Sequence, residues 1–143
     1  MTTRKLTVAL LAGGKSAERE VSLKSGEQVY RALNKDRYDI RRYDPRDDLL
    51  RLAQDAETVD VALIILHGRL GEDGTIQGLF EILNVAYVGA GVLASAACMD
   101  KAVCKDLAQS AGIPVLPYRV FSRSQITDYL EEVITLSEAV SAY

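Results

Sequence analysis

The sequence predicts an α/β fold built on a parallel sheet, and two observations support that prediction. Short, strongly apolar runs alternate with segments whose apolar residues recur at helical spacing, and glycine-rich turns separate many of them. Strands that helices cover on both faces have continuous apolar runs, whereas strands with one wet face alternate apolar and polar residues. The resulting order, β-α-β-α-β-α-β, indicates a Rossmann-like sheet with helices on both faces.

The first two-thirds of the chain supplies these elements. The strands are expected at residues 6–12, 38–44, 61–66 and 86–88, and the helices at residues 18–33, 49–53 and 75–83. Gly13-Gly14 ends the first strand and Pro45 ends the second. We expect strand 38–44 near a sheet edge, because arginines and aspartates interrupt it.

The last third is predicted to begin a second domain. Residues 92–98 can form a turn of helix, and Asp100 can cap a further helix that Gly112 closes. Residues 115–121 look like a strand. Ser122 and Gln125 have capping-box spacing ahead of an amphipathic helix whose apolar face is Ile126, Tyr129, Leu130 and Val133.

One strand and one helix cannot bury both their faces alone. The predicted division is therefore an amino-terminal α/β substrate-binding domain at residues 1–98, followed by a linker helix and the beginning of another domain at residues 99–143.

Composition and charge exclude several classes of protein. The 143 residues are 48% hydrophobic and 26% charged, with no apolar stretch long enough to span a bilayer. The polar start of the chain lacks the features of a signal peptide, so we expect a cytoplasmic protein without a membrane partner. A net charge of −3 with scattered basic residues argues against nucleic-acid binding. Cys98 and Cys104 match no metal or redox spacing and are expected to be reduced, packed thiols.

The first candidate loop for chemistry follows the first strand, from Gly13 to Glu20. A glycine turn before a helix can cradle a phosphate with backbone N–H groups, but the dinucleotide and P-loop spacings are absent. A structural interpretation also fits, with a tight glycine turn, Ser16 as the helix cap, and Glu18 and Glu20 complementing the helix dipole. Alternatively, the carboxylates hold a cationic group of a substrate.

The second candidate loop follows the third strand and contains the only histidine, His67. A lone histidine there is more often an orienting residue than a catalyst, and Glu72 and Asp73 can be an acidic cap on the next helix. Three glycines within seven residues favour a functional loop, because they let backbone approach a ligand closely. In an open α/β sheet, ligands bind at the carboxyl ends of the strands.

Three motifs together resemble the D-alanine–D-alanine ligases of the ATP-grasp group. They occur in the family's order and spacing, and the similarity runs from about Leu6 to at least Pro117. The motifs are Gly13-Gly14-Lys15-Ser16-Ala17-Glu18-Arg19-Glu20-Val21-Ser22, His67-Gly68-Arg69-Leu70-Gly71-Glu72-Asp73-Gly74-Thr75-Ile76-Gln77-Gly78, and Tyr87-Val88-Gly89-Ala90-Gly91-Val92 with Ser95 and Met99-Asp100-Lys101 beyond it.

The resemblance implies an amino-terminal pre-ATP-grasp domain followed by an incomplete start of the ATP-grasp central domain. Such enzymes use ATP to convert one D-alanine carboxylate into an acylphosphate, which the amine of a second D-alanine attacks, and the product feeds peptidoglycan synthesis. The family uses Mg²⁺ or Mn²⁺, whose ligands lie in its carboxyl-terminal domain, so no metal ligand is expected here. Family members are commonly homodimers.

The resemblance also implies roles for individual residues. Glu18 would pair with the ammonium of the first D-alanine, and Val21 would contact its methyl group. His67 would stand near the substrate carboxylate and the transferred phosphoryl group, donating a hydrogen bond rather than acting as the base. Lys101 would reach ATP phosphate as a point charge. Gly89 to Gly91 would be a structural turn.

Three interpretations of the chain remain open at this point. It can be the first part of a ligase, in which case these 143 residues alone are expected to make no D-alanyl-D-alanine. It can be a truncated, non-catalytic protein that binds D-alanine or has a regulatory or structural role. It can also be a nucleotide-binding domain unrelated to ligases.

Overall fold

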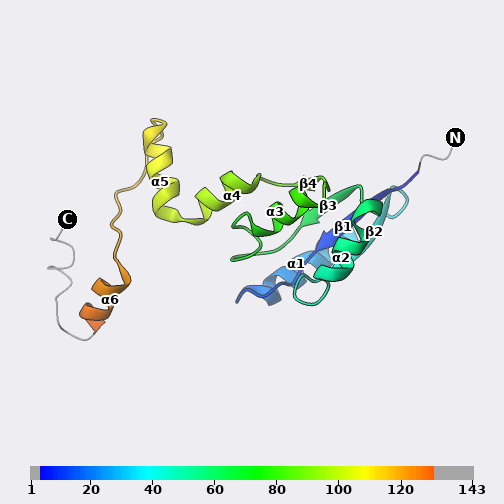
Figure 1. Cartoon of the computed structure of the whole chain (residues 1–143), viewed down its shortest axis with the longest axis horizontal. Helices are drawn as coiled ribbons and strands as arrows, with labels where there is room; N and C mark the ends of the chain where they lie inside the picture. The colour runs from blue at the N-terminus through cyan, green and yellow to red at the C-terminus, as the bar shows by residue number, and fades with distance from the viewer. Residues whose placement is uncertain (1–3, 131–143) are drawn as a thin grey trace. The chain divides into compact units, whose positions relative to one another are not determined.

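The chain folds into two compact units, Met1–Lys101 and Ala102–Tyr143, in a computed structural model that describes residues 4–130. A four-stranded parallel sheet is the centre of the first unit (Figure 1). Its strands are β1 (Leu6–Leu11), β2 (Tyr38–Tyr43), β3 (Val61–Ile64) and β4 (Tyr87–Val88), in the order β2-β1-β3-β4. The predicted α/β class, the four parallel strands and the edge position of β2 are confirmed.

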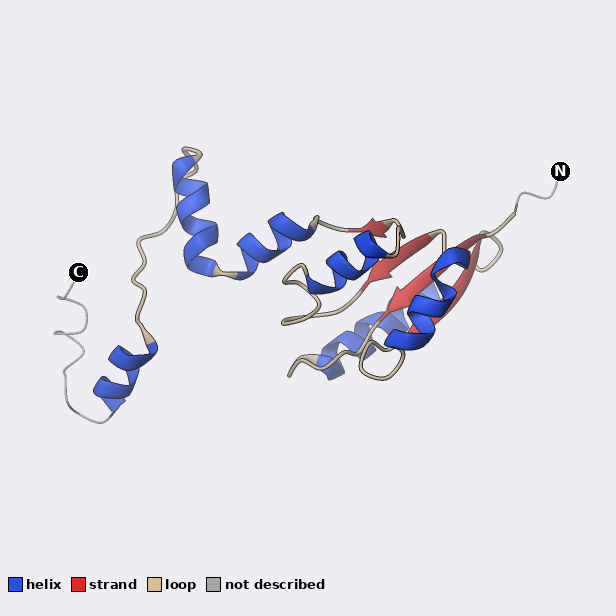
Figure 2. Cartoon of the chain, viewed as in Figure 1, coloured by secondary structure: helices blue, strands red, loops and turns tan. Residues whose placement is uncertain are grey.

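Helices alternate with these strands as the sequence pattern predicts. They are α1 (Arg19–Ala32), α2 (Leu49–Asp55), α3 (Thr75–Ile82) and α4 (Val92–Met99), with a short 3-10 turn, η1 (Ala56–Thr58), after α2. Helices α1 and α2 lie on opposite sides of the strands (Figure 2). The prediction of helices on both faces is therefore confirmed.

The two sides of β1 pack against different helices, as the alternation of side chains along a strand requires. Ala9 and Leu11 are fully buried in a core cluster with Leu52 of α2 and Phe80 of α3. On the other side, Gly26 of α1 lies so close to Ala12 that an added Cβ would be 2.4 Å from the Ala12 Cβ. A larger residue than glycine would push α1 away from the end of β1.

The second unit contains most of α5 (Lys101–Ser110) and α6 (Arg123–Leu130). Gly112, at φ 74°, ends α5 as predicted, and the Ile113 amide donates to the Ala108 carbonyl at 2.9 Å. The capping box is also present, because the Ser122 amide donates to Gln125 Oε1 at 2.8 Å and the Gln125 amide to Ser122 Oγ at 3.2 Å. Val133, assigned to the face of this last helix, lies outside the described residues.

Two predictions for this end of the chain are wrong. Residues 115–121 form no strand, because within residues 4–130 no neighbouring segment pairs with them. Cys98 and Cys104 form no disulfide within residues 4–130, and Cys98 is exposed rather than packed. None of the helices within residues 4–130 has the length and apolarity needed to cross a bilayer.

Candidate functional site

The two candidate loops lie side by side because β1 and β3 are adjacent parallel strands. Buried Ser22 of α1 joins the ends of those strands: its Oγ accepts a hydrogen bond from the Gly13 amide at 2.8 Å and donates one to the Ile65 carbonyl at 2.5 Å. Both partners are backbone groups at the carboxyl edge of the sheet. Ser22 therefore fixes the starting points of both loops.

Ser16 and Glu18 connect the first loop directly to the second. Ser16 Oγ donates to the His67 carbonyl at 2.7 Å and accepts from the Glu18 amide at 3.1 Å. Glu18 Oε2 lies so near Gly68 that a Cβ added there would be 2.5 Å from it. Gly68 has φ 69°, a left-handed conformation that favours glycine, and a side chain there would displace the exposed Glu18 carboxylate.

The sequence suggested Ser16 as the cap of α1, but the structure shows a different residue there. Glu18, not Ser16, occupies the N-cap position of α1, and no side chain hydrogen-bonds there as a cap. Ser16 is instead two residues earlier, and its hydroxyl is bonded to the His67 carbonyl. The same hydroxyl oxygen accepts from the Glu18 amide, which precedes the first helical residue, so Ser16 orders the loop ahead of α1.

Two carboxylates of the second loop accept hydrogen bonds from backbone amides of the same loop. The Gly68 amide donates to Glu72 Oε2 at 2.6 Å, and Asp73 accepts from the amides of Leu70 at 2.8 Å and Thr75 at 3.1 Å. Burial alone would raise the pKa of Asp73, but these hydrogen bonds together hold it below its usual value. Leu70 adopts φ 70°, an unfavourable left-handed conformation for leucine. The ionised Asp73 thus stabilises a strained turn beside His67.

The two ring nitrogens of His67 have different surroundings. Its side chain is 35% exposed, and its Nδ1 lies 4.0 Å from Glu72 Oε1. Its Nε2 is buried, and no hydrogen-bond partner for it occurs in residues 4–130. A buried polar atom without a partner is costly, so this nitrogen has a hydrogen-bonding capacity that residues 4–130 leave unused.

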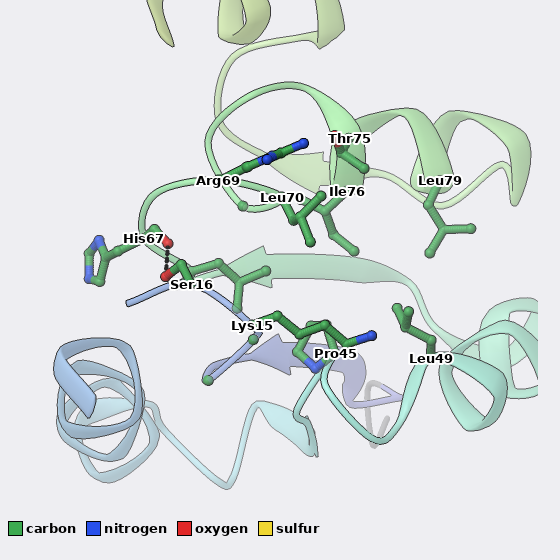
Figure 3. A pocket seen from close by; sticks show the side chains of 14 residues that line it. Lys15, Ser16, Pro45, Leu49, His67, Arg69, Leu70, Thr75, Ile76 and Leu79 are labelled. Carbon is green, nitrogen blue, oxygen red and sulfur yellow. Dashed lines mark hydrogen bonds between the residues drawn. The ribbon is translucent and has the colours of Figure 1, made fainter. Parts of the chain in front are cut away.

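Two hollows meet at His67. A cavity of about 240 Å³ has mainly apolar walls, with Leu70, Ile76 and Leu79 on one side and Pro45 and Leu49 on the other (Figure 3). The His67 ring points away from the middle of this cavity. A wider cavity, of about 510 Å³, is lined on its polar side by His67, Glu72, Gln77, Ser95 and Lys101.

The four residues that the family resemblance implicates do not all share one cavity. Glu18 lines a third, open hollow of about 650 Å³ with Lys15, Gly68 and Arg69. Exposed Lys101 lines the wider cavity with His67, and its Nζ donates to the Cys98 carbonyl at 3.2 Å. Val21 is 58% exposed on α1 and lines none of these three hollows.

Sequence reasoning assigned no separate role to Ser22 or Asp44. A serine facing the core side of an amphipathic helix is a weak signal for Ser22, and an aspartate at the end of an edge strand is a weak signal for Asp44. No group of three histidine, cysteine or acidic side chains among residues 4–130 is placed to hold a metal ion.

Comparison with known proteins decides the family. The model of the family described as D-ala D-ala ligase N-terminus matches residues 7–48 and 41–90. The chain belongs to this family. The match covers β1, both candidate loops and β4, so a nucleotide-binding domain unrelated to ligases is no longer an alternative.

Two curated ligases agree with this assignment. The chain is 64% identical over 128 residues to the D-alanine–D-alanine ligase of Syntrophobacter fumaroxidans, covering 90% of this chain and 41% of that protein. It is 47% identical over 130 residues to the ligase of Desulfotalea psychrophila, covering 91% and 40% respectively. The chain thus spans about two-fifths of the length of these relatives.

Solved ligase structures have the same fold. The D-alanine–D-alanine ligase of Bacillus anthracis complexed with ATP superposes with a TM-score of 0.74 at 33% identity, covering 82% of this chain and 41% of that one. The ligase of Aeromonas hydrophila gives 0.73 at 27% identity, covering 84% and 52%. The ligase family therefore has both the sequence motifs and the sheet of this chain.

Proposed function

We propose that this chain is the amino-terminal part of an ATP-dependent ligase that joins two D-alanines through an acylphosphate, supplying peptidoglycan synthesis. The contact between the Glu18 loop and the His67 loop supports this proposal most directly. The Glu18 carboxylate lies beside Gly68, directly after His67, whose Nε2 has no hydrogen-bond partner within residues 4–130. An amino acid has a matching pair of groups, one ammonium and one carboxylate.

Each residue then has a distinct task. Glu18 pairs with the ammonium of the first D-alanine, a charge-assisted contact worth about 1.5–3 kcal/mol. His67 donates a hydrogen bond to its carboxylate as negative charge develops during phosphoryl transfer. Val21 supplies a small apolar contact for the methyl group, although it is exposed in this structure.

In this proposal, the rest of the ligase supplies the metal ligands and most of the ATP site. Lys101 offers an ammonium to ATP phosphate at the edge of the cavity that His67 lines. When bound, ATP supplies the phosphoryl group that activates the first carboxylate. We assign Mg²⁺ or Mn²⁺ to the carboxyl-terminal part of the enzyme, as the family resemblance implies.

The remaining family properties are proposed on the same basis. Residues 1–98 form the substrate-binding domain, and residues 99–143 form the linker helix and the start of the central domain. The enzyme works in the cytoplasm, where both ATP and D-alanine are available, and it forms a homodimer.

A chimera tests the proposed function. The chain replaces the matching segment of the Syntrophobacter fumaroxidans ligase, and phosphate release is measured with ATP and D-alanine. We expect D-alanine-dependent phosphate release and formation of D-alanyl-D-alanine, and neither from the 143 residues alone. Glu18→Gln is expected to lower kcat/KM for D-alanine about 10- to 100-fold, as loss of a charge-assisted hydrogen bond predicts.

Glu20→Gln is the matched control, because its carboxylate is two residues away and its side chain is 88% exposed. It should leave kcat/KM nearly unchanged. A folded chimera without activity would overturn the proposal. D-alanine binding by that inactive protein would favour the non-catalytic interpretation instead.

A further inference from the structure

Asp44 closes the carboxyl end of β2 and is bonded to the first candidate loop. Its Oδ1 accepts from the Gly14 amide at 2.8 Å and from the Arg46 amide at 3.0 Å. Its side chain is only 19% exposed although β2 is an edge strand. A Cβ added to Gly13 would lie 2.4 Å from Asp44 Oδ2, so the carboxylate fills the space that glycine leaves open.

The second oxygen of Asp44 binds the first residue of α1. Arg19 Nη2 lies 2.5 Å from Asp44 Oδ2, and the Arg19 side chain is 25% exposed. Partial burial and close approach make such a pair stronger than a surface ion pair. The contact from Arg19 to Glu20 is 3.7 Å long and its acidic partner is 88% exposed, so Asp44 is the main anchor of Arg19.

Arg19 directly follows Glu18, and the backbone around them is bonded on both sides. The Arg19 amide donates to the Ser16 carbonyl at 3.2 Å, and the Ser22 amide donates to the Glu18 carbonyl at 3.0 Å. A continuous path of contacts thus leads from Asp44 through Arg19 to Glu18, whose carboxylate touches Gly68. Movement of Arg19 would move the start of α1 and Glu18 with it.

We propose that Asp44, acting through Arg19 and the Gly14 amide, is a positioning residue that holds Glu18 against the His67 loop for the first D-alanine. The inference rests on the proposed function. It adds a role for the residue that directly follows β2. Asp44 does not touch substrate; it fixes the place from which Glu18 does.

The first test uses the 143-residue chain and needs no activity. The amide signal of Gly68 is recorded by NMR in the unaltered chain and in Glu18→Ala, which removes the neighbouring carboxylate. In Asp44→Asn and in Arg19→Gln, we expect the Gly68 signal to move towards its Glu18→Ala position. Asp39→Asn is the control: it removes a carboxylate near Arg41 at the opposite end of β2, and should leave Gly68 unmoved.

The second test uses the chimera. Asp44→Asn is expected to raise KM for D-alanine about tenfold, with kcat and KM for ATP little changed. A tenfold change corresponds to about 1.4 kcal/mol of binding free energy, lost because Glu18 is no longer held in place. Arg19→Gln should do the same, and the double variant should cost little more than either alone, since both break one path. Asp39→Asn should change none of these constants.

The outcomes separate this inference from the proposed function. An inactive unaltered chimera would overturn the proposed function, and the Gly68 signal would still decide whether Asp44 positions Glu18. An unmoved Gly68 signal in both Asp44→Asn and Arg19→Gln would overturn the inference, as would an unchanged KM for D-alanine in an active chimera. If Asp44→Asn does not fold, the Gly68 signal and the KM of Arg19→Gln test the inference instead. This variant leaves Asp44 bonded to the Gly14 amide.

Discussion

The two units differ in burial far more than in composition. The first unit buries large side chains completely, among them Leu10, Leu11, Tyr43 and Phe80. In the second, no residue of known burial between 102 and 130 is buried, and Leu116 is 80% exposed. Apolar residues occur in both. An apolar segment therefore becomes a strand or a core element only where another element is present to pair and pack with it.

The largest difference in stability between the two units is expected when one large apolar side chain is removed from each. Phe80 is fully buried and stacks on Tyr87, with ring centroids 6.1 Å apart. We expect Phe80→Ala to lower the free energy of unfolding by about 3–5 kcal/mol, through lost burial and an unfilled cavity. Leu116→Ala should change it by less than about 0.5 kcal/mol. Urea denaturation followed by circular dichroism measures both, and equal effects would contradict the contrast.

Removing one hydroxyl from each unit should give a smaller difference. Ser22→Ala leaves the Gly13 amide and the Ile65 carbonyl without their buried partner, and should cost about 1–3 kcal/mol. Ser110→Ala removes an exposed bond to the Asp106 carbonyl in α5, and should be neutral or slightly stabilising because alanine favours helix. The same urea measurements decide. A neutral Ser22→Ala would mean that water replaces the hydroxyl.

The smallest expected difference is in how the stability of each unit depends on pH. It involves a carboxylate at acid pH in the first unit and a phenol at alkaline pH in the second. In the first unit, hydrogen bonds from Arg4 and then from the Thr7 amide hold the pKa of Asp60 below its usual value. The unfolded chain therefore binds the proton first, and this stabilisation is present above the usual pKa and is lost as pH falls through the folded value. Asp60→Asn should flatten the acid side of a plot of urea midpoint against pH.

In the second unit, a hydrogen bond from Tyr118 to Asp106 raises the pKa of the Tyr118 phenol. That stabilisation is present below the usual tyrosine pKa and is lost as pH rises through the folded value. Tyr118→Phe should therefore flatten only the alkaline side of the plot. Unaltered curves for both variants would show that these exposed bonds do not persist in solution.

Sequence reasoning succeeded where the signal is local. The glycine at position 112 and the spacing of Ser122 and Gln125 specify helix ends by geometry within one or two turns, and the structure contains both. The strand expected at 115–121 failed because pairing depends on a partner that no local pattern specifies. Ser16 does not cap α1, because the helix begins at Arg19; its hydroxyl donates to the His67 carbonyl and accepts from the Glu18 amide.

The alternation of strands and helices, the two glycine-rich loops and the family that shares them can all be recognised in the amino-acid sequence. Which side chains meet at the sheet edge follows from the folded chain. Glu18 touches Gly68, Asp44 binds Gly14 and Arg19, and Ser22 joins the ends of β1 and β3. These contacts join residues far apart in sequence, because the register of adjacent parallel strands, not local spacing, brings their carboxyl ends together.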